Sequence, residues 1–205
     1  MELHNFWFTS DPHYFHVRAL EIMPYRPWKT LKEMNDGLKE NYNNLVSPDD
    51  IVFFLGDVVM GVKGETVPQI LPYLNGKKFL VRGNHDGGFQ VEKGKQIFWD
   101  RLYLNNDFIN VFDGLINLNQ ILDSYNLEIP IQIDLCHFPY EGTPDHEGYD
   151  RKFYDIMPKE TDNLLLHGHT HSRVQRTSPK MIHIGVDSWD WKPVNLTSVL
   201  ELYHQ

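Results

Sequence analysis

The sequence predicts an α/β domain. Short apolar runs bounded by turn residues alternate along the 205 residues with longer stretches of amphipathic, helical periodicity. This is the pattern of strands and helices in alternation. No segment repeats at a fixed period and none is low in complexity, which excludes solenoid and disordered chains. The length suits one domain over residues 1–205, with no linker that would divide it.

The first half of the chain predicts three strands and two helices. A helix is expected over Thr30–Val46, because Thr30 is a favourable N-cap residue and apolar residues follow at spacings of three and four. Those apolar residues are Leu31, Met34, Leu38, Tyr42 and Leu45. The strands are expected over Asn5–Thr9, Ile51–Leu55 and Lys78–Val81, and the second helix over Thr66–Leu74.

The second half predicts one helix and then mostly strands. The helix covers Gln96–Leu104, and residues 108–135 are expected to be rich in strands, with turns near Asp113–Gly114 and Asp123–Asn126. Later strands are expected over Ile129–Cys136, Asn163–Leu166, Met181–Val186 and Leu196–Leu202.

Charge and cysteine content exclude several classes of function. Nineteen Lys and Arg against 28 Asp and Glu give a formal charge of −9, whereas non-specific nucleic-acid binding needs a basic face. The single cysteine, Cys136, cannot form an internal disulfide, which favours a reducing compartment. The side chain of Cys136 is expected in the core.

The N-terminus lacks a signal-peptide pattern, and no run approaches the ~18 apolar residues of a membrane span. The sequence therefore predicts a cytoplasmic protein without membrane contact.

Polar residues follow five of the predicted strands at the point where each ends. The clusters are Asp11-x-His13, Gly56–Asp57, Gly83–Asp86, His137 and Gly168–His171. Ligands bind beyond the carboxyl ends of strands in open α/β sheets, so these side chains are expected to meet at one site. Taken singly the clusters are weak, since a glycine–aspartate pair is commonly a turn and His137 alone is compatible with a core histidine. The last cluster is the most informative, because alternate residues of an extended segment point the same way.

In this order, the motifs D-x-H, G-D, G-N-H-D, H and G-H-x-H resemble those of the calcineurin-like metallophosphoesterase superfamily, and most closely its small bacterial and phage members. The resemblance spans Phe8 to His171. It implies two packed mixed β-sheets flanked by helices, and a centre with two divalent metal ions. Asp11, His13 and His171 would hold one ion, Asn84, His137 and His169 the other, and Asp57 would bridge both.

Imidazole, carboxylate and amide ligands suit Mn, Fe, Zn or Ni, and Mn is the expected ion in vitro. Two divalent ions, two aspartates and a bridging hydroxide leave a charge of about +1 at the centre, which favours an anionic substrate. The resemblance thus implies hydrolysis of a phosphate ester by a hydroxide that bridges the ions. A small phosphodiester is expected, with a nucleotide as one candidate. A phosphomonoesterase is the alternative, because both reactions use the same metal core.

Supporting roles are expected for several neighbours of these motifs. The resemblance implies that His85 is catalytic and assists the leaving group, with Asp86 orienting its imidazole. His167 either supports a neighbouring ligand from behind or packs within its strand. His16 and Arg26 are candidates for substrate contact, although a surface loop fixed by proline explains Arg26 equally well.

Two alternatives come from other functional classes. The superfamily contains a retromer subunit that binds proteins and lacks the catalytic histidine, whereas His85 and all seven ligand-type residues are present here. A nuclease acting on long DNA or RNA needs a basic track, and Lys77–Lys78, Arg173 and Arg176 are too few to form one. The partner expected from the sequence is therefore a small phosphorylated molecule.

Overall fold

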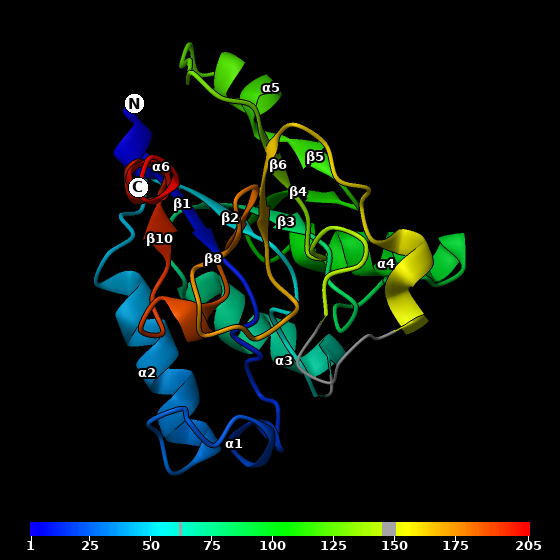
Figure 1. Cartoon of the computed structure of the whole chain (residues 1–205). Coiled ribbons are helices and arrows are strands. Elements are labelled where there is room, and N and C mark those ends of the chain that lie inside the picture. The colour runs from blue at the N-terminus through cyan, green and yellow to red at the C-terminus, as the bar shows by residue number, and fades with distance from the viewer. Residues whose placement is uncertain (62, 145–150) are drawn as a thin grey trace.

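Two β-sheets of five strands each, packed face to face, form the centre of the fold (Figure 1). The computed structural model describes residues 1–61, 63–144 and 151–205 of the chain. Helices flank the two sheets, and each sheet contains both parallel and antiparallel pairs. The predicted class, an α/β fold with two packed mixed sheets, is confirmed.

The first sheet has the strand order β10-β1-β2-β3-β4. Four of its strands run parallel, and only β10 at one edge pairs antiparallel with its neighbour β1. Its strands are β1 (Phe6–Thr9), β2 (Ile51–Phe54), β3 (Lys77–Val81), β4 (Phe108–Phe112) and β10 (Val194–Asn195). Parallel neighbours end at the same edge of a sheet, so the segments after β1, β2 and β3 lie side by side.

The second sheet has the order β5-β6-β7-β9-β8. Its three central strands, β6, β7 and β9, are parallel, and the outer strands β5 and β8 are antiparallel to their neighbours. The strands are β5 (Ile116–Asn117), β6 (Ile133–Leu135), β7 (Leu164–His167), β8 (Arg176–Ser178) and β9 (Met181–His183).

Strand alternation divides the core into layers. Phe53 on β2 faces the second sheet, where it joins a buried cluster with Leu135 and Leu166, whereas its neighbours Val52 and Phe54 face the helices on the opposite side. The first sheet is therefore buried on both faces, which accounts for its continuously apolar strands. A third, smaller cluster around Phe138 covers the outer face of the second sheet.

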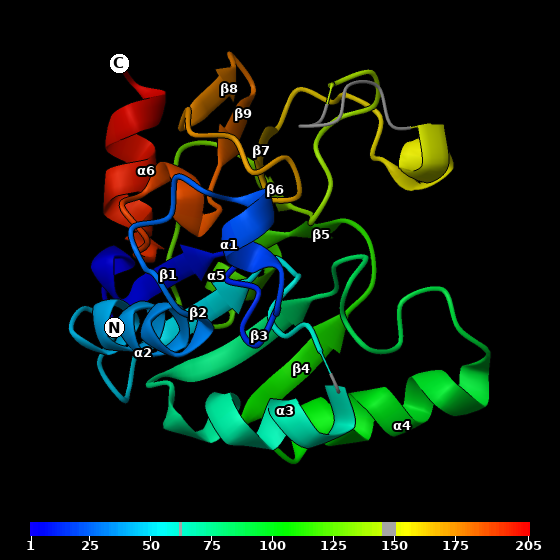
Figure 2. The ribbon, with the colours of Figure 1, turned by 90° about the horizontal axis from the view of Figure 1, so that it is seen from below.

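Three helices, α2, α3 and α4, cover the outer face of the first sheet (Figure 2). The hydroxyl of Thr30 accepts a hydrogen bond from the backbone N–H of Glu33, which confirms Thr30 as the N-cap of α2. The six α-helices described are α1 (Ala19–Ile22), α2 (Leu31–Asn43), α3 (Lys63–Ile70), α4 (Lys93–Leu104), α5 (Leu118–Asp123) and α6 (Leu196–Tyr203). Short 3₁₀ helices cover Leu3–Asn5, Leu71–Tyr73, Arg151–Ile156 and Val186–Ser188.

The strand predicted over Leu196–Leu202 is wrong, because this segment is helix α6. The side chain of Asn195 accepts a hydrogen bond from the Ser198 N–H and caps the helix, and Leu196 and Val199 lie on its buried side. The prediction rested on the apolar content of the segment, whereas the spacing of three between Leu196 and Val199 is that of a helix. Residues 118–123 likewise form helix α5 within the stretch expected to be rich in strands, and the strand expected over Ile129–Cys136 is limited to β6.

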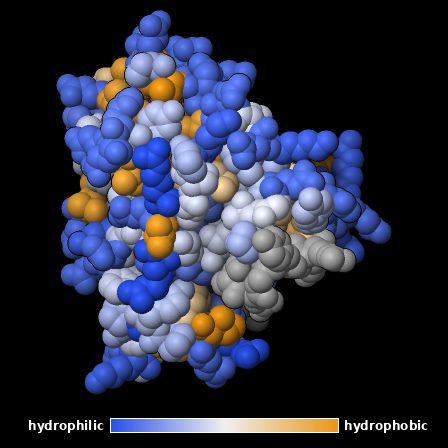
Figure 3. Space-filling view, viewed as in Figure 1, coloured by the Kyte–Doolittle hydropathy of each residue, from blue (hydrophilic) through white to orange (hydrophobic). Residues whose placement is uncertain are grey.

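Apolar side chains on the face shown in Figure 3 occur singly or in small groups among polar ones. None of the helices in the described part of the chain has both the length and the apolar character needed to cross a bilayer. Both termini lie near α6, on the same side of the molecule (Figure 1).

Candidate functional site

The seven candidate metal ligands come from five loops, each at the carboxyl end of a parallel strand. Three of these loops follow β1, β2 and β3 of the first sheet, and two follow β6 and β7 of the second. Contacts between the loops join the two sheets at this edge: the His169 N–H donates to Asp11 Oδ2 at 3.0 Å, and the His137 ring binds the carbonyl of Leu55 through Nδ1 at 2.8 Å. The predicted convergence of strand ends is therefore present in the fold.

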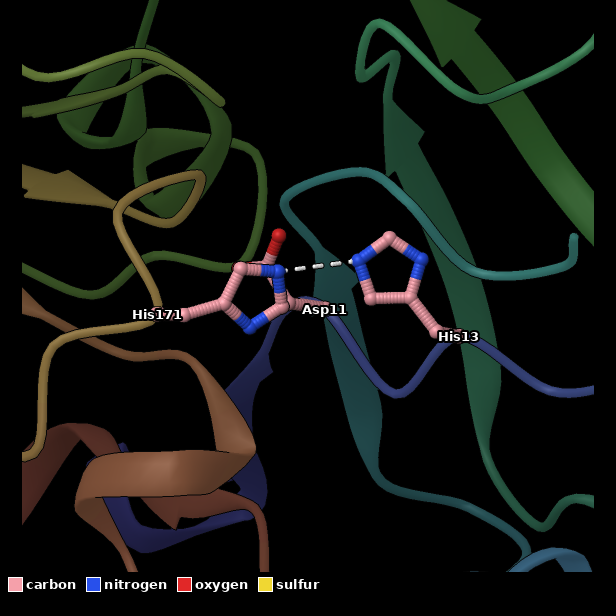
Figure 4. A group of neighbouring side chains, drawn as sticks. All are labelled: Asp11, His13 and His171. Atoms are coloured by element: carbon pink, nitrogen blue, oxygen red, sulfur yellow. Dashed lines mark hydrogen bonds between the residues drawn. The ribbon is translucent and has the colours of Figure 1, made fainter. Parts of the chain in front are cut away.

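The first group of side chains consists of Asp11, His13 and His171 (Figure 4). One ligand-type atom from each lies within 4.8 Å of the others. The Nε2 atoms of His13 and His171 face each other at 3.1 Å, although the two residues are 158 positions apart in the sequence. Asp11 and His13 are buried, and His171 is half-buried.

The second group consists of Asn84, His137 and His169. The Oδ1 atom of Asn84 lies 2.9 Å from Nε2 of His137 and 3.0 Å from Nδ1 of His169. An amide oxygen thus lies between two imidazoles, each of which is carried by a different strand end of the second sheet.

The carboxylate of Asp57 lies between the two groups. Its Oδ2 atom is 3.7 Å from Nε2 of His13 and 3.6 Å from Nε2 of His137. Its Oδ1 atom accepts a hydrogen bond of 2.8 Å from the backbone N–H of His85, which orients the carboxylate. The Asp57 side chain is 2% exposed, so both groups share a carboxylate that is largely shielded from water.

Two of the candidate ligand histidines have a defined tautomer. The Nδ1–H of His137 donates to the carbonyl of Leu55 at 2.8 Å, and the Nδ1–H of His171 donates to Asp187 Oδ2 at 2.8 Å. In a neutral ring, Nε2 then carries the lone pair that a metal ion requires. Burial, with the neighbouring His169, lowers the pKa of His137 well below its usual value, so this ring stays neutral.

Unsatisfied polar atoms test whether these residues suit a cation. In residues 1–61, 63–144 and 151–205, Asp11 Oδ1 is buried and has no hydrogen-bond partner. Burial raises the pKa of Asp11 to about 6, partly offset by His171; a nearby cation would favour the ionised form. His137 Nε2 and Asn84 Oδ1, both acceptors in this arrangement, face each other. Buried acceptors without donors are the environment that a bound metal ion satisfies.

The backbone of the candidate ligands is unusual. Eleven non-glycine residues in the described part of the chain have positive φ, and five of them are candidate ligands. Those five are Asp11 (57°), His13 (51°), Asp57 (53°), His169 (67°) and His171 (47°). Left-handed backbone is unfavourable for residues with a Cβ and concentrates at functional sites, where the surrounding structure holds it in place.

Gly56 allows the loops to approach closely. It has φ of 90°, and a Cβ at this position would lie 2.6 Å from the backbone of Gly83 and 2.6 Å from Nδ1 of His137. Any side chain here would push the loop after β3 and the His137 ring away from Asp57. The glycine of the predicted G-D motif is therefore required by packing as well as by the turn.

His85 and His16 lie at the edge of the first group. Both side chains are half-buried, and their ring centroids lie 5.6 Å and 5.8 Å, respectively, from that of His13. These positions agree with the catalytic contact expected of His85 and the substrate contact expected of His16, which both remain predictions.

Asp86 has a different role from the one expected. Its carboxylate accepts hydrogen bonds from the backbone N–H groups of Asp57, Val58 and Gly83 at 2.8–3.0 Å, and a longer one from the Tyr103 hydroxyl at 3.4 Å. Among the described residues, these are the groups it binds, and the His85 ring is not one of them. Asp86 instead fastens the loop that carries Asp57 to the loop that carries Asn84.

Arg26 also differs from the expectation of substrate contact. Its side chain is completely buried, and its five N–H groups have acceptors within the protein. Two of them bind the carboxylate of Asp187. No donor of Arg26 is left for a substrate phosphate, because the residue lies beneath the site and not on its wall.

His167 is buried within β7. Its Nε2 contacts the Thr177 hydroxyl at 2.9 Å, and its Nδ1 contacts the carbonyl of Gly168. Of the two expectations, packing within the strand describes these contacts better. Burial lowers the pKa of His167 to about 4, so the ring is neutral near neutral pH.

Sequence reasoning missed Asp187, which holds both Arg26 and His171. The rule used for the other loops would have found it, because Asp187 follows β9 at the same edge of the second sheet. The predicted strand, Met181–Val186, extends past the true end of β9 at His183. That error hid one more polar residue after a parallel strand.

Comparison with known proteins places this site in a family. Residues 4–182 match the sequence model of the calcineurin-like phosphoesterases. The Gene 66 protein of Mycobacterium phage D29 is 32% identical over 196 residues, which cover 90% of this chain and 89% of that protein. An uncharacterized protein of Methanocaldococcus jannaschii is 37% identical over 87 residues, which cover 42% of this chain and 49% of that protein.

A solved structure supports the fold. A protein of unknown function from Aquifex aeolicus has a TM-score of 0.66 at 22% identity, and the match covers 96% of this chain and 98% of that chain. The family match extends over most of the 205 residues and includes the loops that converge at the site. The chain therefore belongs to the calcineurin-like phosphoesterase family and is a metal-dependent phosphoester hydrolase.

Proposed function

We propose that the chain is a two-metal phosphoesterase that hydrolyses a small phosphodiester. The observation that best supports this is the position of Asp57, whose Oδ2 atom lies 3.7 Å and 3.6 Å from the Nε2 atoms of His13 and His137 in the two groups. One ion would be held by Asp11, His13 and His171, the other by Asn84, His137 and His169, and Asp57 would contact both.

Two divalent ions, when bound, supply an activated water as the nucleophile and neutralise charge on the phosphate. The donor set combines imidazole, carboxylate and one amide oxygen, and contains no thiolate. This chemistry suits Mn, Fe, Zn or Ni. We propose Mn²⁺ as the ion to use in vitro.

The protein residues position the ions and the substrate. Hydrogen bonds from His137 to Leu55 and from His171 to Asp187 fix ring orientations, so little rearrangement is needed at the moment of reaction. Two divalent ions would bring four positive charges against the two negative charges of Asp11 and Asp57, so the loaded site would favour an anion despite the net charge of −9 of the whole chain.

We assign to His85 the role of assisting the leaving group. Its backbone N–H is fixed on Asp57 Oδ1 at 2.8 Å, while its half-buried ring lies next to His13 at the edge of the site. A protonated imidazole at this position would give its proton to the departing oxygen. This role needs a ring that reaches the substrate and does not hold a metal ion.

A diester is proposed because the G-N-H-D motif resembles that of the small members of the superfamily, which often favour diesters. The experiment compares hydrolysis of bis-p-nitrophenyl phosphate, p-nitrophenyl phosphate and a panel of nucleotides by the full chain with Mn²⁺. We expect faster turnover of the diester, and complete loss of activity after exhaustive chelation. Faster turnover of the monoester would show that the chain is a phosphomonoesterase and not a phosphodiesterase. Full activity without metal would refute the two-metal function.

Two variants control this assay. His137→Ala removes a proposed ligand and is expected to abolish activity, whereas His4→Ala removes a histidine whose side chain is 58% exposed and lies outside the site. If wild type binds Mn²⁺ but hydrolyses none of the esters, a scaffold with a retained metal site becomes the better description.

A further inference from the structure

A buried ion pair lies directly behind the group of Asp11, His13 and His171. Arg26 donates from Nε to Asp187 Oδ1 at 2.9 Å and from Nη2 to Asp187 Oδ2 at 3.0 Å. Both side chains are 0% exposed. A two-pronged contact between guanidinium and carboxylate fixes the orientation of the carboxylate as well as its position.

Asp187 passes this orientation on to His171. Its Oδ2 atom accepts the Nδ1–H of His171 at 2.8 Å, which directs the opposite ring atom, Nε2, toward Nε2 of His13 at 3.1 Å. A carboxylate behind a ligand histidine fixes the tautomer and the ring orientation and makes the ring a stronger base. The ion pair therefore controls how His171 presents its lone pair.

Arg26 also binds the backbone that carries the other two residues of the group. Its Nη2 donates to the carbonyl of Asp11 at 2.9 Å, and its Nη1 donates to the carbonyl of Pro12 at 3.0 Å. The D-x-H segment after β1 and the histidine after β7 are thus joined through one arginine and one aspartate. Asp11 and His13 keep their left-handed backbone in this segment.

The second group is held by other contacts. The His137 ring is fixed on the carbonyl of Leu55, and the loops of Asp57 and Asn84 are fastened by Asp86. The two groups also share contacts, because Asp11 Oδ2 accepts from the His169 N–H at 3.0 Å and the His13 N–H donates to the carbonyl of Asp57. In the part of the chain that the structure describes, however, Arg26 and Asp187 bind only the first of the two groups: the ring of His171 and the carbonyls of Asp11 and Pro12.

We propose that Asp187 and Arg26 are positioning residues that set the affinity of one metal ion, the ion held by Asp11, His13 and His171, and leave the other ion in place. This inference rests on the proposed two-metal function. It predicts that damage to the ion pair lowers the affinity of one site for its metal ion and not that of the other. A general loss of stability would weaken both sites.

The test measures Mn²⁺ binding to the full chain by calorimetry, and the magnetic coupling of bound Mn²⁺ by electron paramagnetic resonance. In Asp187→Asn an amide oxygen in the place of Oδ2 still accepts from His171 and from Arg26 Nη2, but the NH₂ group in the place of Oδ1 faces the Arg26 Nε–H, and the negative charge behind His171 is lost. We expect one Mn²⁺ to bind as in wild type and the other to bind about 10–100-fold more weakly. With one equivalent of Mn²⁺, the variant should show an isolated ion.

The control is Asp134→Asn. Asp134 is also a buried carboxylate, but it accepts from the side chains of Asn117 and Asn163, away from the site. This variant should bind both ions as wild type does. Unchanged affinity for both ions in Asp187→Asn, or an equal loss at both sites, would overturn the inference.

A second variant covers the case in which Asp187→Asn does not fold. Arg26→Lys keeps the positive charge but cannot bridge both oxygens of Asp187 and two carbonyl groups at once. It should weaken the same ion, and wild-type binding of both ions would count against the inference. A wild-type chain that binds fewer than two Mn²⁺ would instead refute the proposed function, before any variant is compared.

Discussion

Replacing Asp86 by asparagine tests the contact that joins two loops of the site. In wild type, Asp86 Oδ2 accepts from the N–H groups of Asp57 and Gly83, both at 2.8 Å, and Oδ1 accepts from that of Val58 at 3.0 Å. An asparagine oxygen in the place of Oδ2 preserves the first two bonds. Its NH₂ group then faces the Val58 N–H, so one buried backbone donor loses its acceptor.

The magnitude follows from these three bonds. A buried donor without an acceptor costs about 1–3 kcal/mol, and each of the two remaining bonds weakens by about 1 kcal/mol when its acceptor is no longer charged. Burial raises the pKa of Asp86, so the neutral amide is easier to bury than the carboxylate, which offsets part of the loss. We expect Asp86→Asn to lower the free energy of unfolding by about 2–4 kcal/mol.

Urea unfolding of the metal-free full chain measures this change. Asp134→Asn is the matched control, because its partners are the side-chain amides of Asn117 and Asn163, which can rotate to suit the new group. The free energy of unfolding of this control should fall by only about 1 kcal/mol. If Asp86→Asn unfolds at the same urea concentration as wild type, or is no less stable than the control, then Asp86 does not fasten the two loops.

Three further predictions concern the site and its surroundings. Asp57→Asn should bind less Mn²⁺ per chain than His13→Ala, measured by elemental analysis, because the two ions then repel each other without the shared carboxylate; equal metal contents would contradict the bridging role. His85→Ala should retain metal but lose about 10²–10⁴-fold in kcat, more for an alkoxide than for p-nitrophenolate as leaving group, and an unchanged kcat on both would refute catalysis by His85. In the folded chain the pKa of His167 is lowered to about 4, so as pH falls below about 6.5 the unfolded chain binds the proton first and wild type loses stability. Between pH 7 and pH 5, the free energy of unfolding should therefore fall by about 2 kcal/mol less in His167→Gln than in wild type. An identical fall in both proteins would contradict this.

The sequence predicted strands β1, β2, β3, β6, β7 and β9 because they are buried, whereas the less buried or very short strands β8 and β10 were not predicted. Runs such as Ile51–Phe54 are apolar throughout, and the polar residue that follows marks the end of the strand. The same rule identified every cluster that meets at the site. It failed at β9, where the expected strand was three residues too long and hid Asp187.

Other features depended on contacts that no local pattern encodes. Arg26 stands in a loop with two prolines nearby, and only the folded chain shows that its guanidinium is buried against Asp187, 161 residues away. Asp86 follows His85 directly, yet its carboxylate turns toward backbone N–H groups of another loop. Helix α6 was missed because its apolar residues also fit a short buried strand, and its start is marked only by the hydrogen bond from the Ser198 N–H to Asn195.

The left-handed backbone at Asp11, His13, Asp57, His169 and His171 has an evolutionary consequence. Each such position costs about 1 kcal/mol relative to glycine, so five together approach the net stability of a small domain, about 5–15 kcal/mol. A descendant that no longer hydrolyses phosphate esters would gain stability by acquiring glycine at these positions. Substitutions that abolish activity at these positions would therefore make the fold more stable. Carboxylates and imidazoles persist there only while selection for hydrolysis outweighs selection for stability.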